Sequence, residues 1–180
     1  MSSGRDEKRQ RLFFALWPDE EVRESLDQAA GELLGKRIRR IVAANLHITL
    51  AFAGSVGAEV RRCLEDAAED IRVPGFELCI DRVGHWPRPR ILWAAPTHVP
   101  AELWSLEGAL RQAFEACDLK PDTRHFQPHI TLARKLGRAP ENSGFPPLRW
   151  SIRDFSLVES VTDPAGSRYH VLRSWALGGG

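Results

Sequence analysis

The pentapeptide His-Ile-Thr-Leu-Ala occurs twice in this chain, at residues 47–51 and again at residues 129–133. Each copy follows a stretch with helical periodicity and has the alternating pattern of a β-strand. A strand sequence repeated in matching contexts is typical of a fold built from two similar halves. The sequence therefore predicts two lobes, each contributing one of these strands.

Strict alternation divides each copy into an apolar face and a face where His and Thr stand beside small alanines. The His and Thr face is expected to present His47, Thr49, Ala51 and Ala53 in the first copy, and His129, Thr131 and Ala133 in the second. The apolar face is expected to present Leu46, Ile48, Leu50 and Phe52, and in the second copy Ile130 and Leu132. Because alanines leave space, the first of these faces is expected to line a ligand site.

The rest of the chain alternates between helical and strand patterns, which predicts an α+β fold. Helices are expected at residues 19–34, 58–71 and 100–119, where apolar residues recur at three-to-four spacing. Strands are expected at 12–17, 45–54, 76–83, 90–95, 127–134, 151–160 and 169–177. The segments 76–83 and 90–95 are expected to form a hairpin, and so are 151–160 and 169–177.

Composition narrows the class of protein. A chain of 180 residues, 43% of them hydrophobic, can bury the core of a single domain. Its 25 basic and 24 acidic residues nearly cancel, so an anionic ligand must be held by local charge. Cys63, Cys79 and Cys117 lack a CxxC spacing, which predicts buried thiols in a reducing compartment and no disulfide framework.

The N-terminal residues 1–11 are polar, and the sequence has no apolar run of about eighteen residues that could span a bilayer. We therefore expect a cytoplasmic protein without a signal peptide or a membrane segment. Its function then depends on the chemistry of the two repeated strands.

Two histidines that face one cavity can divide proton donation and proton acceptance, because the ordinary pKa of imidazole lies near neutrality. Threonine hydroxyls two residues further along each strand can donate hydrogen bonds to phosphate oxygens. One HxT sequence alone would be read as ordinary strand residues, whereas two in matching contexts favour a catalytic pair. The combination suits in-line displacement at phosphorus.

A metal site is the main competing use of histidines. The stretch His-Phe-Gln-Pro-His at 125–129 has zinc-like spacing, but Pro128 opposes a helix, and a strand would hold His125 and His129 about 13 Å apart. A Walker loop, a GxGxxG fingerprint and a serine nucleophile elbow are absent from the sequence. We therefore expect no metal and no cofactor.

The chain resembles the 2H phosphoesterases, and among them the bacterial and archaeal RNA 2′,3′-cyclic phosphodiesterases, also named 2′-5′ RNA ligases. The resemblance rests on residues 11–16, 45–54, 87–94, 126–134 and 169–177. It implies a bilobal fold in which two antiparallel sheets line a central groove, with helices on the outer faces. It also implies one bilobal catalytic domain at 11–180, and the polar residues 1–10 before it are expected to form a disordered tail.

The same resemblance implies metal-independent hydrolysis of RNA ends that carry a 2′,3′-cyclic phosphate, to 2′-phosphomonoesters. His47 would be the proton donor to the departing 3′-oxygen, and His129 the acceptor that activates water. Thr49 and Thr131 would bind the phosphate. The residues themselves leave donor and acceptor open, because the two copies are equivalent in sequence.

Two further site residues follow less directly. Arg134 resembles a phosphate-binding arginine of the family, but strict alternation places it opposite His129, so a twist or bulge is needed to turn it round. Phe13 fits either a base-stacking platform or ordinary core packing. The basic run at 36–40, together with Arg88 and Arg90, fits either RNA phosphates or solvated surface.

Two alternative functions remain open. One is 2′-5′ ligation in the same groove, which is the reverse chemistry. The other is an RNA-binding or nucleotide-binding module without turnover, although pure binding does not require an acid and a base. The expected partners are RNA or oligonucleotide ends, and the expected state is a monomer.

Overall fold

The computed structural model describes residues 9–140, 144–164 and 166–178. Its helices are α1 (Glu20–Leu34), α2 (Ala58–Glu69) and α3 (Ala101–Ala116), with a short 3₁₀ turn at Ala43–Asn45. Its strands are β1 (Gln10–Leu16), β2 (Ile48–Val56), β3 (Phe76–Ile80), β4 (Arg82–Trp86), β5 (Ile91–Ala95), β6 (Ile130–Arg134), β7 (Leu148–Ile152), β8 (Asp154–Asp163) and β9 (Gly166–Ala176). The three helices occur where the periodicity predicts them, with ends shifted by a few residues.

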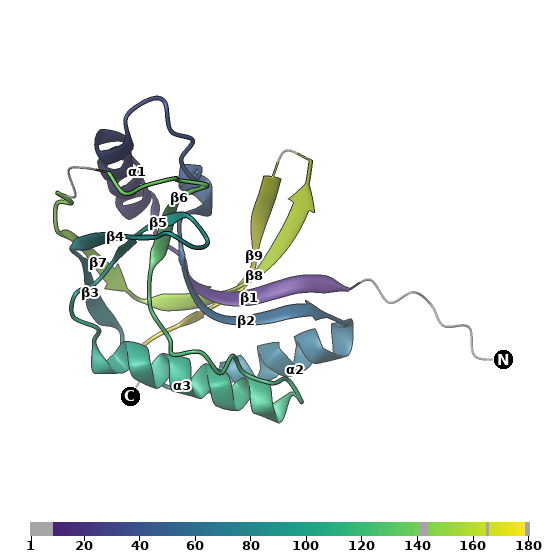
Figure 1. Cartoon of the computed structure of the whole chain (residues 1–180). Helices are drawn as coiled ribbons and strands as arrows, with labels where there is room; N and C mark the ends of the chain where they lie inside the picture. Colours follow the sequence, from purple (N-terminus) through teal and green to yellow (C-terminus); the bar gives the residue numbers. More distant parts are fainter. Residues whose placement is uncertain (1–8, 141–143, 165, 179–180) are drawn as a thin grey trace.

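The strands form two antiparallel sheets, which confirms the expected α+β class (Figure 1). The larger sheet has the order β4-β5-β6-β2-β1-β8-β9, and the smaller one pairs β3 with β7. Both strands of the repeated motif belong to the larger sheet, one from each half. The halves are joined by the β2–β6 contact, whose register pair is Ile48 with Ile130.

The prediction that 76–83 forms a single strand paired with 90–95 is wrong. The segment 76–83 divides at Asp81 into β3, which pairs with β7, and β4, which pairs with β5. β3 and β7 match because each buries alternate apolar side chains, including Leu78 opposite Trp150. The chain thus crosses from the small sheet to the large one within two residues.

The helices pack their apolar faces against the sheets: α1 contacts β7 of the small sheet, and α2 and α3 contact strands of the large sheet. The α1 helix begins at Asp19, whose side chain accepts a hydrogen bond from the Val22 amide, and it ends at Gly35 with a φ of 66°. The α2 and α3 helices lie side by side on one side of the molecule, as Figure 1 shows. The α3 helix also packs on β2 and so supports the first HxT strand from behind.

The cysteine expectation is wrong for two of the three residues. Cys63 on α2 and Cys117, which caps the end of α3, form a disulfide with their Cα atoms 5.8 Å apart. Cys79 on β3 is a free thiol. The 54-residue separation of the bonded pair gives no sequence signal, because it depends on how α2 and α3 pack.

The tail expected at 1–10 falls mostly on residues 1–8, which lie outside the described residues. Within the described part, Gln10 already belongs to β1, and the Arg9 side chain donates to the Ser55 carbonyl. The first strand therefore begins one residue before the expected start of the domain at residue 11. None of the described helices combines the length and the apolar composition needed to span a membrane.

Candidate active site

The contact between the two HxT strands places the four motif side chains around one point. Ile48 and Ile130 are direct antiparallel partners. Extending this register by one residue each way sets His47 across from Thr131 and Thr49 across from His129. The four residues therefore lie at the corners of a square. The two histidines are on one diagonal and the two threonines on the other, and residues on the same diagonal are roughly 7–8 Å apart.

A β-bulge follows the first threonine. Along the β1–β2 pair, Ala15 opposes Thr49, but the next partner, Phe14, opposes Ala51, so Leu50 is the extra residue. The bulge reverses the alternation, so Ala51 packs against the core and Phe52 turns outward with 45% of its surface exposed. The expectation that Phe52 lies on the apolar face is therefore wrong.

An equivalent bulge follows the second threonine. Trp93 opposes Thr131, and the next residue back, Leu92, opposes Ala133, so Leu132 is the extra residue. Ala133 is fully buried, and Arg134 turns to the same side as the motif. The bulge at Leu132 is the irregularity that was needed to turn Arg134 to the same side as His129.

The motif residues His47, Thr49, His129 and Thr131 line one cleft of about 1400 Å³. Its cationic lining residues are Arg11, Arg37, Arg39, Arg40, Arg134, Lys135 and Arg168. The described residues that line it include no carboxylate. A chain whose net charge is +1 therefore concentrates positive charge around the two histidines.

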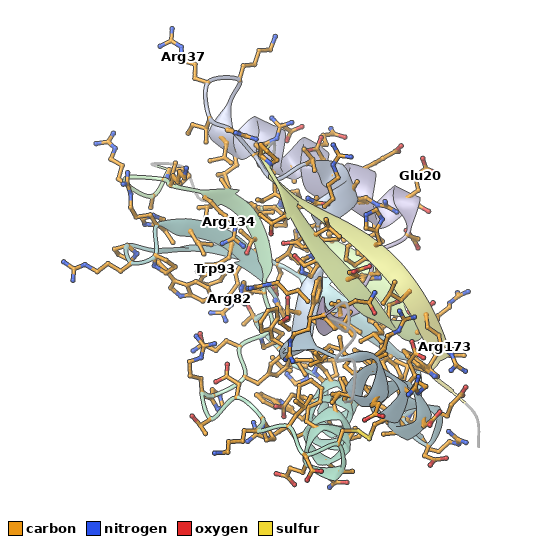
Figure 2. All side chains as sticks on the ribbon, turned by 90° about the vertical axis from the view of Figure 1, so that its right-hand side faces the viewer. Glu20, Arg37, Arg82, Trp93, Arg134 and Arg173 are labelled. Atoms are coloured by element: carbon orange, nitrogen blue, oxygen red, sulfur yellow. A yellow bond between two sulfur atoms is a disulfide. The ribbon has the colours of Figure 1, made fainter. Side chains whose placement is uncertain are left out.

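The basic run at 36–40 contributes Arg37, Arg39 and Arg40 to this lining. Arg37 projects from the loop after α1, whereas Arg134 lies on the sheet below it in the view of Figure 2. Arg40 also forms an ion pair with Asp27 at 3.4 Å. Arg88 and Arg90, proposed from the same reasoning, are not among the described lining residues.

The His47 ring is oriented by the main chain. Its Nδ1 lies 2.7 Å from the Asn45 carbonyl oxygen, which can only accept, so Nδ1 carries the proton and donates it. Its Nε2 lies 3.1 Å from the Thr49 hydroxyl, which donates to it when the ring is neutral. The nitrogen available for proton transfer is therefore Nε2.

His129 is held in the same way. Its Nδ1 donates to the Gln127 carbonyl oxygen at 2.7 Å. Gln127 lies two residues before His129 in the chain, just as Asn45 lies two residues before His47. The two imidazoles therefore have the same tautomer when neutral, with Nε2 as the nitrogen that carries no hydrogen. The two copies of the motif are therefore equivalent in sequence and also in the main-chain hydrogen bond that fixes the tautomer of each histidine.

Aromatic rings surround the two histidines unequally. The His47 ring stacks on Trp17 with centroids 5.2 Å apart, and Tyr169 meets its edge at 5.1 Å. Phe13 lies 5.0 Å from the same ring, is only 3% exposed and packs with Ala15 in a small buried cluster. Phe13 thus offers little free surface for a base, and its main contact in the site is with His47.

A single large ring lies against the second histidine among the described aromatic contacts. Trp86 meets the His129 ring edge-on at 4.7 Å and packs on Trp93 at 5.4 Å. The sequence provided no signal for Trp17, Trp86 or Tyr169, because each approaches its histidine from a different element of the fold. His170, to which the sequence assigned no role, also lines the cleft.

Burial and neighbouring charge lower the pKa of both histidines. Burial lowers the pKa of His47 to about 4, with smaller contributions from the charges of His129 and Arg134, against the opposing Asn45 hydrogen bond. Burial also lowers the pKa of His129, opposed by the Gln127 hydrogen bond and assisted by Arg134. The shared influence of Arg134 shows that its charge is felt by both rings.

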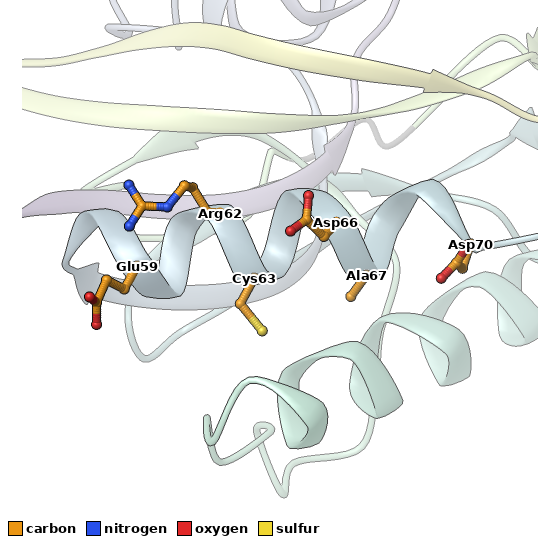
Figure 3. A pocket seen from close by; sticks show the side chains of 6 residues that line it. All are labelled: Glu59, Arg62, Cys63, Asp66, Ala67 and Asp70. Atoms are coloured by element: carbon orange, nitrogen blue, oxygen red, sulfur yellow. The ribbon is translucent and has the colours of Figure 1, made fainter.

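A second hollow, of about 540 Å³, lies along α2, where Cys63 and Ala67 point toward α3 (Figure 3). It is lined by Glu59, Arg62, Cys63, Asp66, Ala67 and Asp70. Three carboxylates make it a poor place for an anionic ligand, and the Cys63 sulfur is bonded to Cys117. The cleft with the two histidines is therefore the candidate active site.

Comparisons with known proteins agree with this geometry. A family model described as the 2′-5′ RNA ligase superfamily matches residues 18–164. The RNA 2′,3′-cyclic phosphodiesterase of Escherichia coli is 38% identical over 173 residues, covering 93% of this chain and 97% of that enzyme. The enzyme of the same name from Thermus thermophilus is 32% identical over 186 residues, covering 94% and 91%.

Solved structures show the same fold. A crystal structure described as a phosphoesterase has a TM-score of 0.88 at 34% identity, covering 96% of this chain and all of that one. Escherichia coli LigT complexed with 3′-AMP has a TM-score of 0.87 at 34% identity, covering 94% and 99%. The resemblance inferred from the paired motifs is confirmed, and this chain belongs to the 2′-5′ RNA ligase superfamily.

Proposed function

We propose that this chain hydrolyses the 2′,3′-cyclic phosphate at the ends of RNA or oligonucleotides and leaves a 2′-phosphomonoester. The observation that supports this most directly is the pair of imidazoles, each with Nδ1 held by a backbone carbonyl, that line one basic cleft. Curated relatives with the same activity in their names support the choice of substrate.

In the proposed reaction, the cyclic phosphate lies between the four motif side chains. The hydroxyls of Thr49 and Thr131 donate to its non-bridging oxygens, and Arg134 offsets the charge that develops there. Thr49 donates to His47 Nε2 in this structure, so it would exchange that acceptor for a phosphate oxygen. The diagonal arrangement leaves the two histidines on opposite sides of phosphorus, as in-line displacement requires.

Two protons move in the proposed reaction. His129 Nε2 takes a proton from water while the water oxygen forms a bond to phosphorus. The bond from phosphorus to the 3′-oxygen breaks, and the proton on His47 Nε2 passes to that oxygen. The product has a 2′-phosphate and a free 3′-hydroxyl. His129 loses its proton to solvent, and His47 takes up a new proton when the next phosphodiester anion binds.

We assign the acid role to His47 and the base role to His129. The phosphodiester anion raises the pKa of His47 when it binds, because an opposite charge favours the imidazolium form. Three aromatic rings around His47 keep bulk water from that proton, whereas His129 has a single ring beside it among the described contacts and is easier for a water molecule to reach. With acid, base and charge all supplied by side chains, we expect turnover to be independent of metal.

A single assay tests this proposal. The protein is incubated with EDTA, an oligonucleotide ending in a 2′,3′-cyclic phosphate and a second oligonucleotide with a 5′-hydroxyl, and the products are resolved by mass and by sensitivity to phosphatase. We expect a 2′-phosphate end. A joined 2′-5′ product would instead identify ligation, and binding without any product would identify a module that does not turn over its ligand.

A further inference from the structure

The indole of Trp17 lies flat against the His47 ring. Trp17 directly follows β1, and its ring is 14° from parallel to the imidazole, with the two centroids 5.2 Å apart. The other described rings in contact with His47 meet it at larger angles, 35° for Phe13 and 82° for Tyr169. Trp17 is not among the described residues that line the cleft, so its contact within the site is with the histidine.

Contacts from three parts of the chain hold the two rings in this arrangement. The Asn45 carbonyl oxygen accepts from His47 Nδ1, and the Asn45 side-chain amide donates to the Ser167 carbonyl oxygen on β9 at 2.9 Å. Tyr169, on the same strand, lies edge-on to both the imidazole and the indole. Trp17 packs in turn on a small buried cluster of β1 and β8 side chains. The stack is therefore a fixed feature of the site.

The stack favours the protonated form of His47. A flat cation over an indole face is attracted by the ring electrons, and tryptophan is the aromatic side chain that does this best. A protonated imidazole is such a cation, whereas a neutral imidazole is not. The stack uses the face of the His47 ring and leaves Nε2 in the ring plane, 3.1 Å from the Thr49 hydroxyl. Trp17 can thus stabilise the charge without covering the nitrogen that reacts.

We propose that Trp17 is a positioning residue that stabilises the imidazolium form of His47 and so makes this histidine, and not His129, the acid. This inference deepens the proposed function and rests on it for the identity of the reaction. The motif residues and the main-chain hydrogen bonds are equivalent for the two histidines, so neither of them assigns the acid. The indole beside His47 breaks that equivalence.

The second histidine has no matching stack among the described contacts. Trp86 meets the His129 ring at 75°, with the centroids 4.7 Å apart, so these two rings are nearly perpendicular. His129 thus lacks the parallel π surface that His47 has. The aromatic surroundings therefore favour positive charge at His47 over positive charge at His129.

The charged groups around His47 act against its protonation. His129 and Arg134 on β6 lower its pKa, and Tyr169 is the titratable side chain of β9 that meets its ring. Because like charges disfavour a further cation, the indole face is a source of stabilisation that the cationic lining cannot supply. That lining also includes Arg11 on β1, the arginines of the basic run at 36–40, Lys135, Arg168 and His170.

A titration of the histidine ring resonances by NMR tests the proposal without turnover. The wild type, Trp17→Leu and Trp17→Phe are followed between about pH 2.5 and 8. We expect Trp17→Leu to raise the acid dissociation constant of the His47 imidazolium about 3- to 10-fold, which lowers its pKa, and Trp17→Phe to raise it less. The pKa of His129 should stay as in the wild type.

An apolar cover would have the opposite effect. If Trp17 only excluded water from His47, the smaller leucine would admit water and the pKa of His47 would rise, because hydration favours the charged form. A pKa in Trp17→Leu equal to or above that of the wild type would therefore overturn the proposal. Trp104→Leu is the matched control, because Trp104 on α3 lies against another histidine, His125, with the centroids 5.6 Å apart and outside the described lining of the cleft.

The pH profile of kcat gives a second readout. The acid must be protonated in the complex, so the rate falls at high pH as His47 loses its proton. In Trp17→Leu we expect this alkaline limb to move to lower pH, with a smaller displacement in Trp17→Phe and none in Trp104→Leu. A kcat that is lower by the same factor at every pH, with the limb unmoved, would show a packing role only and would count against the proposal.

The two proposals fail in different ways. If the pKa of His47 falls in Trp17→Leu but the wild type leaves cyclic phosphates intact, the proposed reaction is wrong and the effect of Trp17 on His47 stands. If cyclic phosphates are hydrolysed with the same pH profile by the wild type and Trp17→Leu, the role of Trp17 is wrong and the reaction stands. Unfolding temperatures of all variants confirm that each change is local.

Discussion

Ile48 and Ile130 face each other across the junction between the two halves of the large sheet. Both side chains are fully buried, so the residues before and after them in each strand turn to the opposite side, toward the cleft. One apolar pair thus fixes the relative positions of two histidines and two threonines that lie in motifs 82 residues apart in sequence. The site depends on this junction as much as on the side chains themselves.

Removal of either histidine should abolish most turnover. We expect His47→Ala and His129→Ala each to lower kcat by about 10²–10⁴-fold, the usual contribution of one proton-transfer group. Initial rates with a cyclic-phosphate-ended oligonucleotide measure the effect. His98→Ala, an exposed histidine away from the cleft, is the control, and a near wild-type rate in either motif variant would contradict the mechanism.

Removal of the Arg134 charge should raise the pKa of both histidines. That charge is one of the causes that lower each pKa in the folded protein, so Arg134→Gln relieves it for both. His129→Gln, by contrast, should raise the pKa of His47 alone. Histidine ring resonances followed by NMR between about pH 3 and 8 measure these shifts, and Arg88→Gln, outside the described lining, should change neither pKa.

Stability should fall in acid because of His47. Its pKa is about 4 in the fold against 6.5 in the unfolded chain, so the unfolded chain binds more protons between these values. The free energy of unfolding should therefore decrease as the pH drops from about 6.5 to 4, by about 1–3 kcal/mol. Urea unfolding of the wild type and of His47→Gln measures it, and a variant with an equally steep loss would contradict this explanation.

Reduction of the Cys63–Cys117 disulfide should destabilise the fold. A crosslink closing a 54-residue separation constrains the unfolded chain, so its loss should cost about 2–4 kcal/mol. Urea unfolding with and without reductant measures this in the wild type and in a double alanine variant, whose stability should not respond to reductant. Cys79→Ala should keep the full response, and two free thiols found by mass spectrometry at positions 63 and 117 would contradict the pairing.

A methyl group at Gly84 should disturb the wall beside His129. Gly84 pairs with Trp93 across β4 and β5, and a Cβ on it would lie 2.1 Å from the Trp93 ring. We expect Gly84→Ala to lower the free energy of unfolding by about 1–3 kcal/mol, because Trp93 must move. Gly108→Ala on α3, where a Cβ meets nothing within 4 Å, should stabilise the fold by up to about 1 kcal/mol.

Local patterns were sufficient to predict the helices and to identify the motif residues that line one cleft. The three helices have clear three-to-four apolar spacing, and the paired HxT sequences identified His47 and His129, which line one cleft. Strand partners could not be read in this way. The segment 76–83 belongs to two sheets because Leu78 finds its partner in Trp150, more than 70 positions away.

The two bulges explain why strict alternation did not predict the positions of Phe52 and Arg134. An extra residue in one strand is defined only against the strand it pairs with, β1 for Leu50 and β5 for Leu132. The alternating pattern therefore placed Phe52 in the core and left Arg134 dependent on an irregularity. The basic run at 36–40 could not be told from solvated surface, because its place at the cleft depends on the loop after α1.

The orienting acceptors of both imidazoles are carbonyl oxygens of the main chain, at Asn45 and Gln127. In many enzymes that orientation depends on a carboxylate, which a single codon change can remove. Here every amino acid brings the same acceptor, so exchanges at these two positions preserve the ring tautomer as long as the backbone keeps its path. Under the proposed function, selection can vary the side chains at the mouth of the cleft, and with them the RNA that the cleft accepts, without altering the tautomers of His47 and His129.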